Sequence, residues 1–250
     1  MNEDARRVWQ AAYESSHRSM ADALTGTATA DGILDTYAEA LRRLDGSLEG
    51  TLAWTQNTIA CRAGCSFCCW LQIDVRAHEV FLIVRHLRQT RTPEALAILR
   101  AAAVATLDQT RPMNHEERGR VTLQCVLLQD GLCSVYAVRP AACRRYHSRA
   151  VAACEQLWQG ADEPGEIEFP FVAEMGRHLA NGMHNAFVRA GFDGFCYDLT
   201  SALAEALTYP ECERRWLEKE KAFSADAESK VPPGFSQVEA VARLKASLGE

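Results

Sequence analysis

Cysteine is the residue type in this sequence whose spacing most clearly indicates chemistry. Four of the ten cysteines of the 250-residue chain lie within nine residues, in the order Cys61-x3-Cys65-x2-Cys68-Cys69. Thiolates bind soft metals, which favours Zn²⁺ or an iron–sulfur cluster over Mg²⁺ or Ca²⁺. Cys65 and Cys68 have the spacing of half a tetrahedral zinc site, and three cysteines on one short loop also suit a 4Fe–4S cluster. The segment is therefore predicted to bind a metal.

A second block of cysteines follows further along the chain, with seven, nine and ten residues between its members. A single centre of these types needs about four ligands, so two blocks favour more than one centre. Cys69 follows Cys68 directly, and it either reaches a second centre or is a buried apolar residue. Cys196 and Cys212 stand apart and are left out of the site. The predicted metal ligands are Cys61, Cys65, Cys68, Cys69, Cys125, Cys133, Cys143 and Cys154.

The cysteines could instead form disulfides, as they do in small secreted domains. The first residues, Met1–Trp9, are polar and charged, whereas a secretory signal peptide needs a basic start followed by an apolar run. Adjacent cysteines such as Cys68 and Cys69 also pair poorly with each other or with close neighbours. The expectation is a cytoplasmic protein whose cysteines are metal ligands.

Basic residues accompany the second block of cysteines. Four thiolates around Zn²⁺ or a 4Fe–4S core leave a net charge near minus two, which is costly to bury alone. Arg139 and Arg144 are predicted to bind the cofactor by donating hydrogen bonds to sulfur. Arg145 and Arg149 either do the same or lie on a solvated basic face. His147 is a weaker ligand candidate, because a lone histidine is more often a surface or capping residue.

The composition fits one globular domain. Of the residues, 48% are hydrophobic and 24% are charged, so the chain can bury a full core without the help of a metal. The net charge of -6 and the pI of about 5.7 argue against a broad nucleic-acid surface. No apolar stretch reaches the roughly 20 residues of a membrane span. The expected partner is a protein or a small-molecule substrate, and neither nucleic acid nor a membrane is expected.

Most of the sequence has the periodicity of α-helices. Asp74 is predicted to cap a helix over 75–89 that has one apolar face. Thr92-Pro93-Glu94 is predicted to start the next helix, and the polar segment 109–120 is predicted to be a loop. The other predicted helices cover residues 2–20, 33–49, 171–190, 198–208 and 211–222.

Two short apolar runs on either side of Asp130-Gly131 predict a β-hairpin. If the turn has strictly two residues, Cys125 and Cys133 fall on opposite faces of the ladder. Both could then serve one site only through a bulged turn, or with one ligand beyond the paired region.

A helix is predicted to start at Arg139-Pro140, after the hairpin. It would carry Cys143 and His147 four residues apart on one face. If it runs unbroken to about residue 158, Cys154 shares that face, since eleven residues make close to three turns.

The expected fold class is mainly α. Residues 1–222 are expected to form a single helical domain with a cysteine-rich metal-binding loop and one short β-hairpin, and its metal-chelating core covers about 59–155. Residues 223–250 are expected to be a linker and a short C-terminal helix, because the segment contains Pro232-Pro233-Gly234.

The vicinal pair Cys68-Cys69, the hairpin cysteines and the string Tyr136-x2-Arg139-Pro140-x2-Cys143-Arg144 occur in an order that resembles the YkgJ-type cysteine-cluster family. The resemblance covers about residues 59–150. It implies a zinc- or iron-chelating domain in a cytoplasmic protein, and most members have no assigned activity. Flagellin lysine N-methylases look like relatives with a similar cluster, which implies that some members use S-adenosylmethionine.

Three functions are compatible with the sequence. The first is a metal-binding protein with one or two cysteine-ligated centres, for which an iron–sulfur cluster is slightly favoured over zinc, and with a structural, electron-transferring or metal-handling role. The second is an enzyme with an open position on a cluster, since Cys61-x3-Cys65-x2-Cys68 also resembles the radical S-adenosylmethionine motif. The third is a structural zinc module for protein contacts. The helical pattern disfavours the radical enzyme, whose barrel needs alternating strands and helices.

Overall fold

The structure is a computed structural model that describes residues 3–27, 29–114, 117–118, 121–159 and 165–229. The fold is mainly α, as predicted. The α-helices are α1 (Glu3–Thr25), α2 (Ala30–Trp54), α3 (Ala77–Thr90), α4 (Pro93–Thr110), α6 (Ala141–Arg145), α7 (Val151–Trp158), α8 (Pro170–Arg189), α9 (Leu199–Thr208) and α10 (Glu211–Leu217). Short 3-10 helices are η1 (Phe67–Trp70), η2 (Tyr136–Val138) and η3 (Ala225–Ala227).

The strands form two antiparallel ladders within the described residues, where one hairpin was expected. The hairpin joins β2 (Leu128–Gln129) to β3 (Leu132–Cys133). The additional ladder pairs β1 (Asp74–Val75) with β4 (Tyr197–Asp198), which lie far apart in the sequence. This second ladder ties the segment before α3 to the segment before α9.

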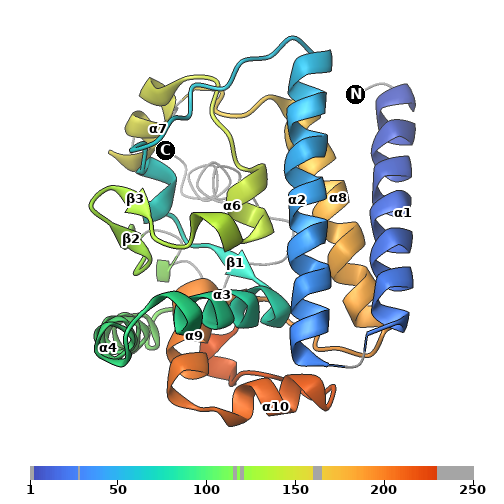
Figure 1. Ribbon diagram of the computed structural model, residues 1–250. Helices are drawn as coiled ribbons and strands as arrows, with labels where there is room; N and C mark the ends of the chain where they lie inside the picture. The colour runs from blue at the N-terminus through green and yellow to red at the C-terminus, as the bar shows by residue number, and fades with distance from the viewer. Residues whose placement is uncertain (1–2, 28, 115–116, 119–120, 160–164, 230–250) are drawn as a thin grey trace.

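Three long helices, α1, α2 and α8, pack together on one side of the molecule (Figure 1). Helices α4, α9 and α10 lie at one end. The opposite corner holds α6, α7, the β2–β3 hairpin and the loop between α2 and β1, and α3 lies between these groups (Figure 1). None of the helices that the structure describes is long and apolar enough to cross a membrane.

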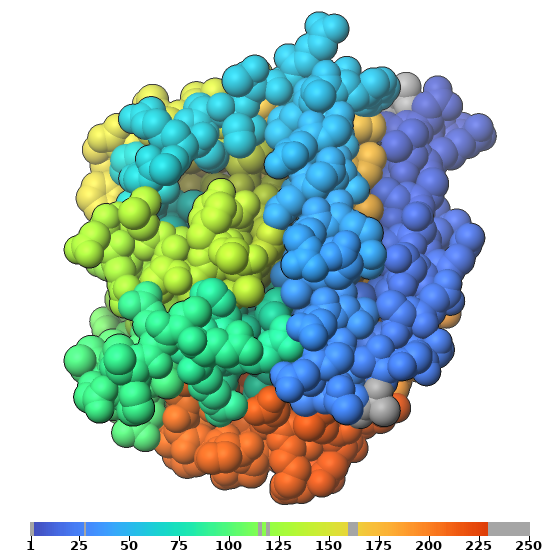
Figure 2. Space-filling model, viewed as in Figure 1, coloured from blue at the N-terminus to red at the C-terminus, as the bar shows by residue number. Residues whose placement is uncertain are grey.

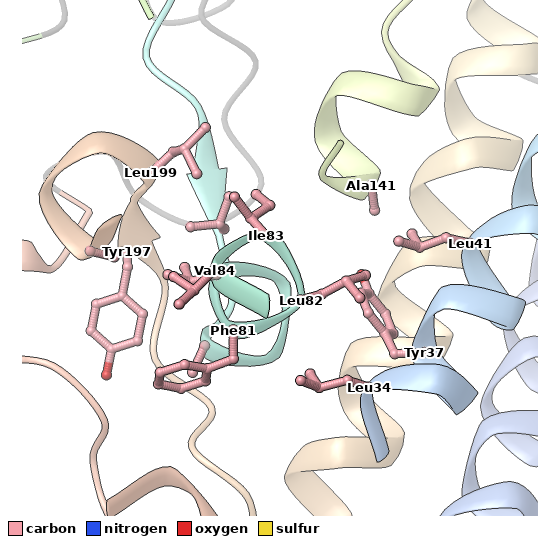
Figure 3. Packing of buried hydrophobic residues seen from close by; sticks show 14 of the residues in the cluster. Leu34, Tyr37, Leu41, Phe81, Leu82, Ile83, Val84, Ala141, Tyr197 and Leu199 are labelled. Atoms are coloured by element: carbon pink, nitrogen blue, oxygen red, sulfur yellow. The ribbon is translucent and has the colours of Figure 1, made fainter. Parts of the chain in front are cut away.

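Helix α3 is buried on nearly every side, which differs from the single apolar face predicted for it. Phe81, Leu82 and Val84 are each no more than 2% exposed. Figure 3 shows Leu82 directed toward Tyr37 of α2, whereas Val84 is directed toward the side of Tyr197. A helix buried on nearly every side is a central core helix, and α3 has that place here.

Local capping signals predicted one helix start correctly and one wrongly. Thr92 is the N-cap of α4, and its side chain accepts a hydrogen bond from the backbone N–H three residues later. Asp74 does not cap α3, because it lies in β1 opposite Asp198. The N-cap is Arg76, whose backbone N–H donates to the Glu79 carboxylate at 2.8 Å. A side chain of the helix itself, that of Glu79, therefore accepts the hydrogen bond at the start of α3.

The hairpin turn has strictly two residues. Asp130 and Gly131 have φ angles of 50° and 75°, as a turn of type I′ requires, and Leu128 pairs with Cys133. Cys125 lies before the ladder. Of the two arrangements that could bring both hairpin cysteines to one site, the structure therefore has the one with a cysteine beyond the paired region.

The helix predicted to start at Arg139-Pro140 does not run unbroken to about residue 158, because the structure has α6 and α7 there, so the condition under which Cys154 would share its face is not met. Between the two helices, Ser148 and Arg149 make long-range backbone hydrogen bonds in place of helical ones. The Ala60 N–H donates to Ser148 O at 2.7 Å, and the Arg149 N–H donates to Ile167 O at 2.8 Å. The two cysteines of this segment consequently lie on different helices.

The remaining predicted elements agree in type and differ at their ends. Helix α4 extends to Thr110, two residues into the predicted loop, and α10 ends at Leu217 rather than 222. Residues 225–227 of the predicted linker form η3, while the rest of that linker from residue 230 and the predicted tail helix lie outside the described residues.

Glycine lets α1 and α8 approach closely. A Cβ placed on Gly182 of α8 would be 2.5 Å from Tyr13 O and 2.9 Å from His17 N, both backbone atoms of α1. On the same helix Met183 and Phe187 are buried in the core, while Met175 and Leu179 stay partly exposed.

The substitution Gly182→Ala should lower the free energy of unfolding by about 1–3 kcal/mol, because backbone atoms of α1 must move to admit the methyl group. Urea unfolding measures this. Gly46→Ala is the control, since nothing lies within 4 Å of a Cβ at this position in α2. There the helix propensity of alanine should raise stability by up to about 1 kcal/mol. Equal effects of the two substitutions would contradict the close contact.

Candidate metal centre

The loop 61–69 is joined by hydrogen bonds to the hairpin on one side and to the segment before α7 on the other. The Cys125 N–H donates to Cys69 O at 2.7 Å. At the opposite end, the Ser148 N–H donates to Cys61 Sγ at 3.2 Å. In Figure 2 the loop (cyan), the hairpin with α6 (yellow-green) and α7 (yellow) gather at one corner of the molecule. The two cysteine blocks, distant in sequence, therefore meet around η1.

Cys61, Cys65 and Cys154 form what we call the first thiol group. Burial raises the pKa of Cys61, the hydrogen bond from Ser148 lowers it, and the charges of Cys65, Cys68 and Cys154 raise it further. Burial also raises the pKa of Cys154, a hydrogen bond with the Ser148 side chain lowers it, and Cys65 and Cys68 raise it. These thiols lie within electrostatic range of one another.

Cys125, Cys133 and Cys143 form the second thiol group. Burial raises the pKa of Cys143 well above its ordinary value, and the charges of Cys125, Cys68 and Cys133 add to the effect. Burial raises the pKa of Cys125 to about 11, and the charges of Cys133 and Cys68 are among those that raise it further. One cysteine from α6 and two from the hairpin region thus share one neighbourhood.

Cys68 and Cys69 lie at the border between the two groups. A hydrogen bond with the Cys69 thiol is the largest cause of the raised pKa of Cys68, followed by burial, while the charge of Arg139 lowers it. Cys68 is an electrostatic neighbour of both groups, and the Cys69 backbone bonds to the second group through Cys125. Each of the two can therefore supply a ligand to one group.

The thiols suit a soft metal by their chemistry, although they do not converge on one point. Among the described residues, no three His, Cys, Asp or Glu side chains are arranged to hold a metal ion, and all ten cysteines are free thiols. Burial and mutual repulsion oppose their ionisation together, and a bound cation removes that penalty. The ligand assignment stays a prediction.

The two cysteines left out of the predicted site lie elsewhere. Cys212 is fully buried in the main core, where the Arg215 guanidinium donates to its sulfur at 3.3 Å. Cys196 lies beside β4, and burial is the largest cause that raises its pKa to about 12, followed by the charge of Asp74.

The two arginines predicted to bind the cofactor have different surroundings. The Arg139 guanidinium stacks on the Tyr136 ring, 3.8 Å from its centroid, and its charge acts on Cys68. Arg144 donates to Arg139 O at 2.9 Å, to Ala137 O at 2.6 Å and to the Asp45 carboxylate. Arg144 therefore clamps the segment before α6 onto α2, whereas Arg139 remains beside a thiol.

Both ring nitrogens of His147 are engaged by backbone groups. The Phe169 N–H donates to Nε2 at 3.0 Å, and Nδ1 lies 3.1 Å from Arg145 O. This assigns the neutral tautomer, in which Nδ1–H donates to the carbonyl. The lone pair that a metal would need already accepts a hydrogen bond, so His147 has a structural role here.

A buried carboxylate fixes the position of α6. Glu79 Oε1 accepts hydrogen bonds from the Ala141 N–H at 2.8 Å and from the Tyr37 hydroxyl at 3.1 Å, while Oε2 accepts from the Arg76 N–H. Glu79 is 3% exposed. One side chain of α3 thus holds α2 and the start of α6, the helix that carries Cys143.

Sequence reasoning missed Glu79 and a pair of histidines next to it. His78 Nε2 lies 3.0 Å from His184 Nδ1, and His184 Nε2 lies 4.0 Å from Glu79 Oε2. Burial lowers the pKa of both rings, to about 4 for His184, so the pair is neutral at neutral pH. The Arg76-x2-Glu79 spacing resembles a capping box and could have indicated Glu79, but no local pattern marks a contact between α3 and α8.

The chain thus has, within a helical body, a cysteine-rich segment of the kind that chelates metals. Residues 60–162 match the family model CxxCxxCC, described as "Putative zinc- or iron-chelating domain". This match confirms the family resemblance drawn from the cysteines, and it covers the loop, the hairpin, α6 and α7. Searches of curated proteins and of solved structures gave no match.

Glu79→Ala should lower the free energy of unfolding by at least about 3 kcal/mol, because three donors, two of them buried, lose their acceptor. Tyr37→Phe removes one of these hydrogen bonds and should cost only about 1 kcal/mol. Urea unfolding of the apo-protein compares the two. A loss from Tyr37→Phe as large as that from Glu79→Ala would show that the carboxylate does not hold α6.

Proposed function

We propose that the protein binds zinc or an iron–sulfur centre through two sets of four cysteines. The first thiol group supplies one set and the second thiol group the other, with Cys68 and Cys69 completing one set each. The observation that carries the proposal is the meeting of two sequence-distant cysteine blocks around η1, with thiols in electrostatic range within each group. The match to a zinc- or iron-chelating family supports it.

The geometry favours two centres over one. The first thiol group draws on the loop and α7, whereas the second draws on the hairpin and α6. Burial is the largest cause that raises the pKa of both Cys143 and Cys61, and the thiols that add to it are Cys125, Cys68 and Cys133 for Cys143 and Cys65, Cys68 and Cys154 for Cys61. Cys68 is common to these two sets of thiols, which supports a position for it between the two groups.

The role of such centres would be structural, electron-transferring or metal-handling. A radical S-adenosylmethionine enzyme needs a barrel of alternating strands and helices. Within the described residues the strands form only two ladders of two strands each, which supports a different role for the cysteine motif.

Single substitutions should separate the two sets. Cys65→Ser should remove about half of the bound metal and Cys133→Ser the other half, because each set loses one of about four ligands. The double variant should bind none. Metal per chain, measured after anaerobic loading and desalting, gives the result.

Cys212→Ala is the matched control, since this thiol lies in the main core. It should keep the full metal content. Loss of all metal from Cys65→Ser alone would mean that the cysteines form one shared centre. Equal loss from Cys212→Ala would overturn the assignment of ligands.

The metal and sulfide content of anaerobically purified protein distinguishes a zinc centre from an iron–sulfur centre. Brown protein that contains iron and acid-labile sulfide would exclude the zinc form, and colourless protein with stoichiometric zinc would exclude the iron–sulfur form. Protein that holds neither metal and takes up neither Zn²⁺ nor iron with sulfide would refute the proposed function.

A further inference from the structure

Cys154 packs in a small apolar cluster at the corner of the molecule that holds the loop 61–69. The buried members of this cluster are Ala153, Cys154 and Ile167, and Phe67 is one of the partly buried residues that pack against them. Among the described residues, the cluster shares no member with the main core. The position of the Cys154 thiol, which is 6% exposed, therefore depends on contacts within this corner.

Aromatic contacts join the end of α7 to η1. The centroid of the Phe67 ring lies 6.0 Å from that of Trp158, and the Trp158 ring meets Trp70 edge to face at 6.0 Å. Aromatic pairs attract each other at such separations. Phe67 and Trp70 are the first and last residues of η1, and Trp158 is the last residue of α7. Cys154 lies four residues before Trp158, so the two side chains share one face of the helix.

Hydrogen bonds attach the other end of α7 to the start of the loop. The Ser148 carbonyl accepts from the Ala60 N–H at 2.7 Å, and the Ser148 N–H donates to Cys61 Sγ at 3.2 Å. Ser148 lies three residues before Val151, where α7 begins. The helix is thus fixed to the loop at both ends, by hydrogen bonds before its first turn and by rings at its last, and Cys154 lies between them.

Phe67 belongs to the same loop as the cysteines that it would serve. It lies two residues after Cys65 and directly before Cys68. The loop carries its own thiols on a short stretch of chain, whereas Cys154 must be brought to it from α7. A ligand that is already held beside the others costs less entropy to recruit. A contact between Phe67 and the cluster around Cys154 provides such preorganisation.

We propose that Phe67 is a positioning residue of the first set of cysteines, whose ring holds Cys154 of α7 against the loop that carries Cys61 and Cys65. The inference rests on the proposed function. Trp158, which is 40% exposed, supports the Phe67 ring from the end of α7.

The second set is attached differently. Cys125 and Cys133 pack against the main core and are not members of the cluster around Cys154. The effect of Phe67 should therefore be confined to the first set, which separates a positioning role from a general contribution to folding.

The test measures Zn²⁺ affinity by competition with a chromophoric chelator, using reduced full-length apo-protein. In a Cys133→Ser background, which leaves the first set as the binding site, Phe67→Ala should weaken binding about tenfold, a usual effect for residues around metal ligands. Phe67→Leu should recover most of this loss, because leucine keeps the apolar contact with Cys154. In a Cys65→Ser background, which leaves the second set, Phe67→Ala should change the affinity by less than about twofold.

Two tryptophans complete the design. Trp158→Ala removes both ring contacts of α7 and should weaken the first set about threefold to tenfold. Because it truncates a partly exposed side chain, it tests the inference even if Phe67→Ala does not fold. Trp54→Ala is the control, since this exposed ring at the end of α2 packs on Phe171 outside the cluster, and its loss should leave both sets unchanged. Thermal unfolding of each apo-variant shows whether the chain is folded at the assay temperature.

Each remaining outcome would overturn the inference. Unchanged affinity of the first set in Phe67→Ala, or in Trp158→Ala where the former does not fold, would show that the rings do not position Cys154. Equal weakening of both sets, or an equal effect of Trp54→Ala, would assign the loss to a general loosening of the fold. A loss in Phe67→Leu as large as that in Phe67→Ala would exclude apolar packing as the cause. If the protein with all its cysteines binds no Zn²⁺ and no iron with sulfide, the proposed function itself fails, and this result is distinct from the others.

Discussion

The carboxylate of Glu79 is 3% exposed, and every hydrogen bond that it accepts comes from a different element. It joins the Tyr37 hydroxyl of α2, the capping N–H of its own helix and the first N–H of α6. A buried charge is tolerated only when such donors surround it, and removing the acceptor would leave all of them unpaired. The histidine pair beside it is neutral, so hydrogen bonds from the protein rather than an imidazolium stabilise this charge.

The second thiol group depends on that arrangement. Helix α6 has five residues, too few to be stable in isolation. Glu79 holds its first turn, and Arg144 holds the preceding segment to Asp45 of α2. Through these two clamps the position of Cys143 follows from the helical core. The loop 61–69 then attaches to the hairpin by the hydrogen bond between Cys125 and Cys69.

Turns and helix starts that are specified by adjacent residues could be predicted from the sequence. Elements that depend on hydrogen bonds to residues far away in the chain could not. Asp130-Gly131 determines a two-residue turn by itself, because both residues accept positive φ. Thr92 and Pro93 likewise specify a helix start within one turn. The break between α6 and α7 has no such signal. It arises because Ser148 bonds to Ala60 and to the sulfur of Cys61, which no pattern within residues 139–158 indicates.

The same distinction between local and distant signals applies to the cysteine site. Residue types and spacing indicated which cysteines to examine, but the sequence does not show that Arg144 bonds to Asp45 and to two backbone carbonyls whereas its neighbour Arg145 packs against Gly176. The clamps on α6 are made of carboxylates, carbonyls and hydroxyls and need no sulfur. The helical body can therefore form without a metal, and burial keeps the thiols that it brings together protonated by raising the pKa of Cys143 and Cys125. A metal bound there would favour the thiolate forms, and its binding energy would act on a framework that already exists, unlike in a zinc finger, whose fold is created by the metal.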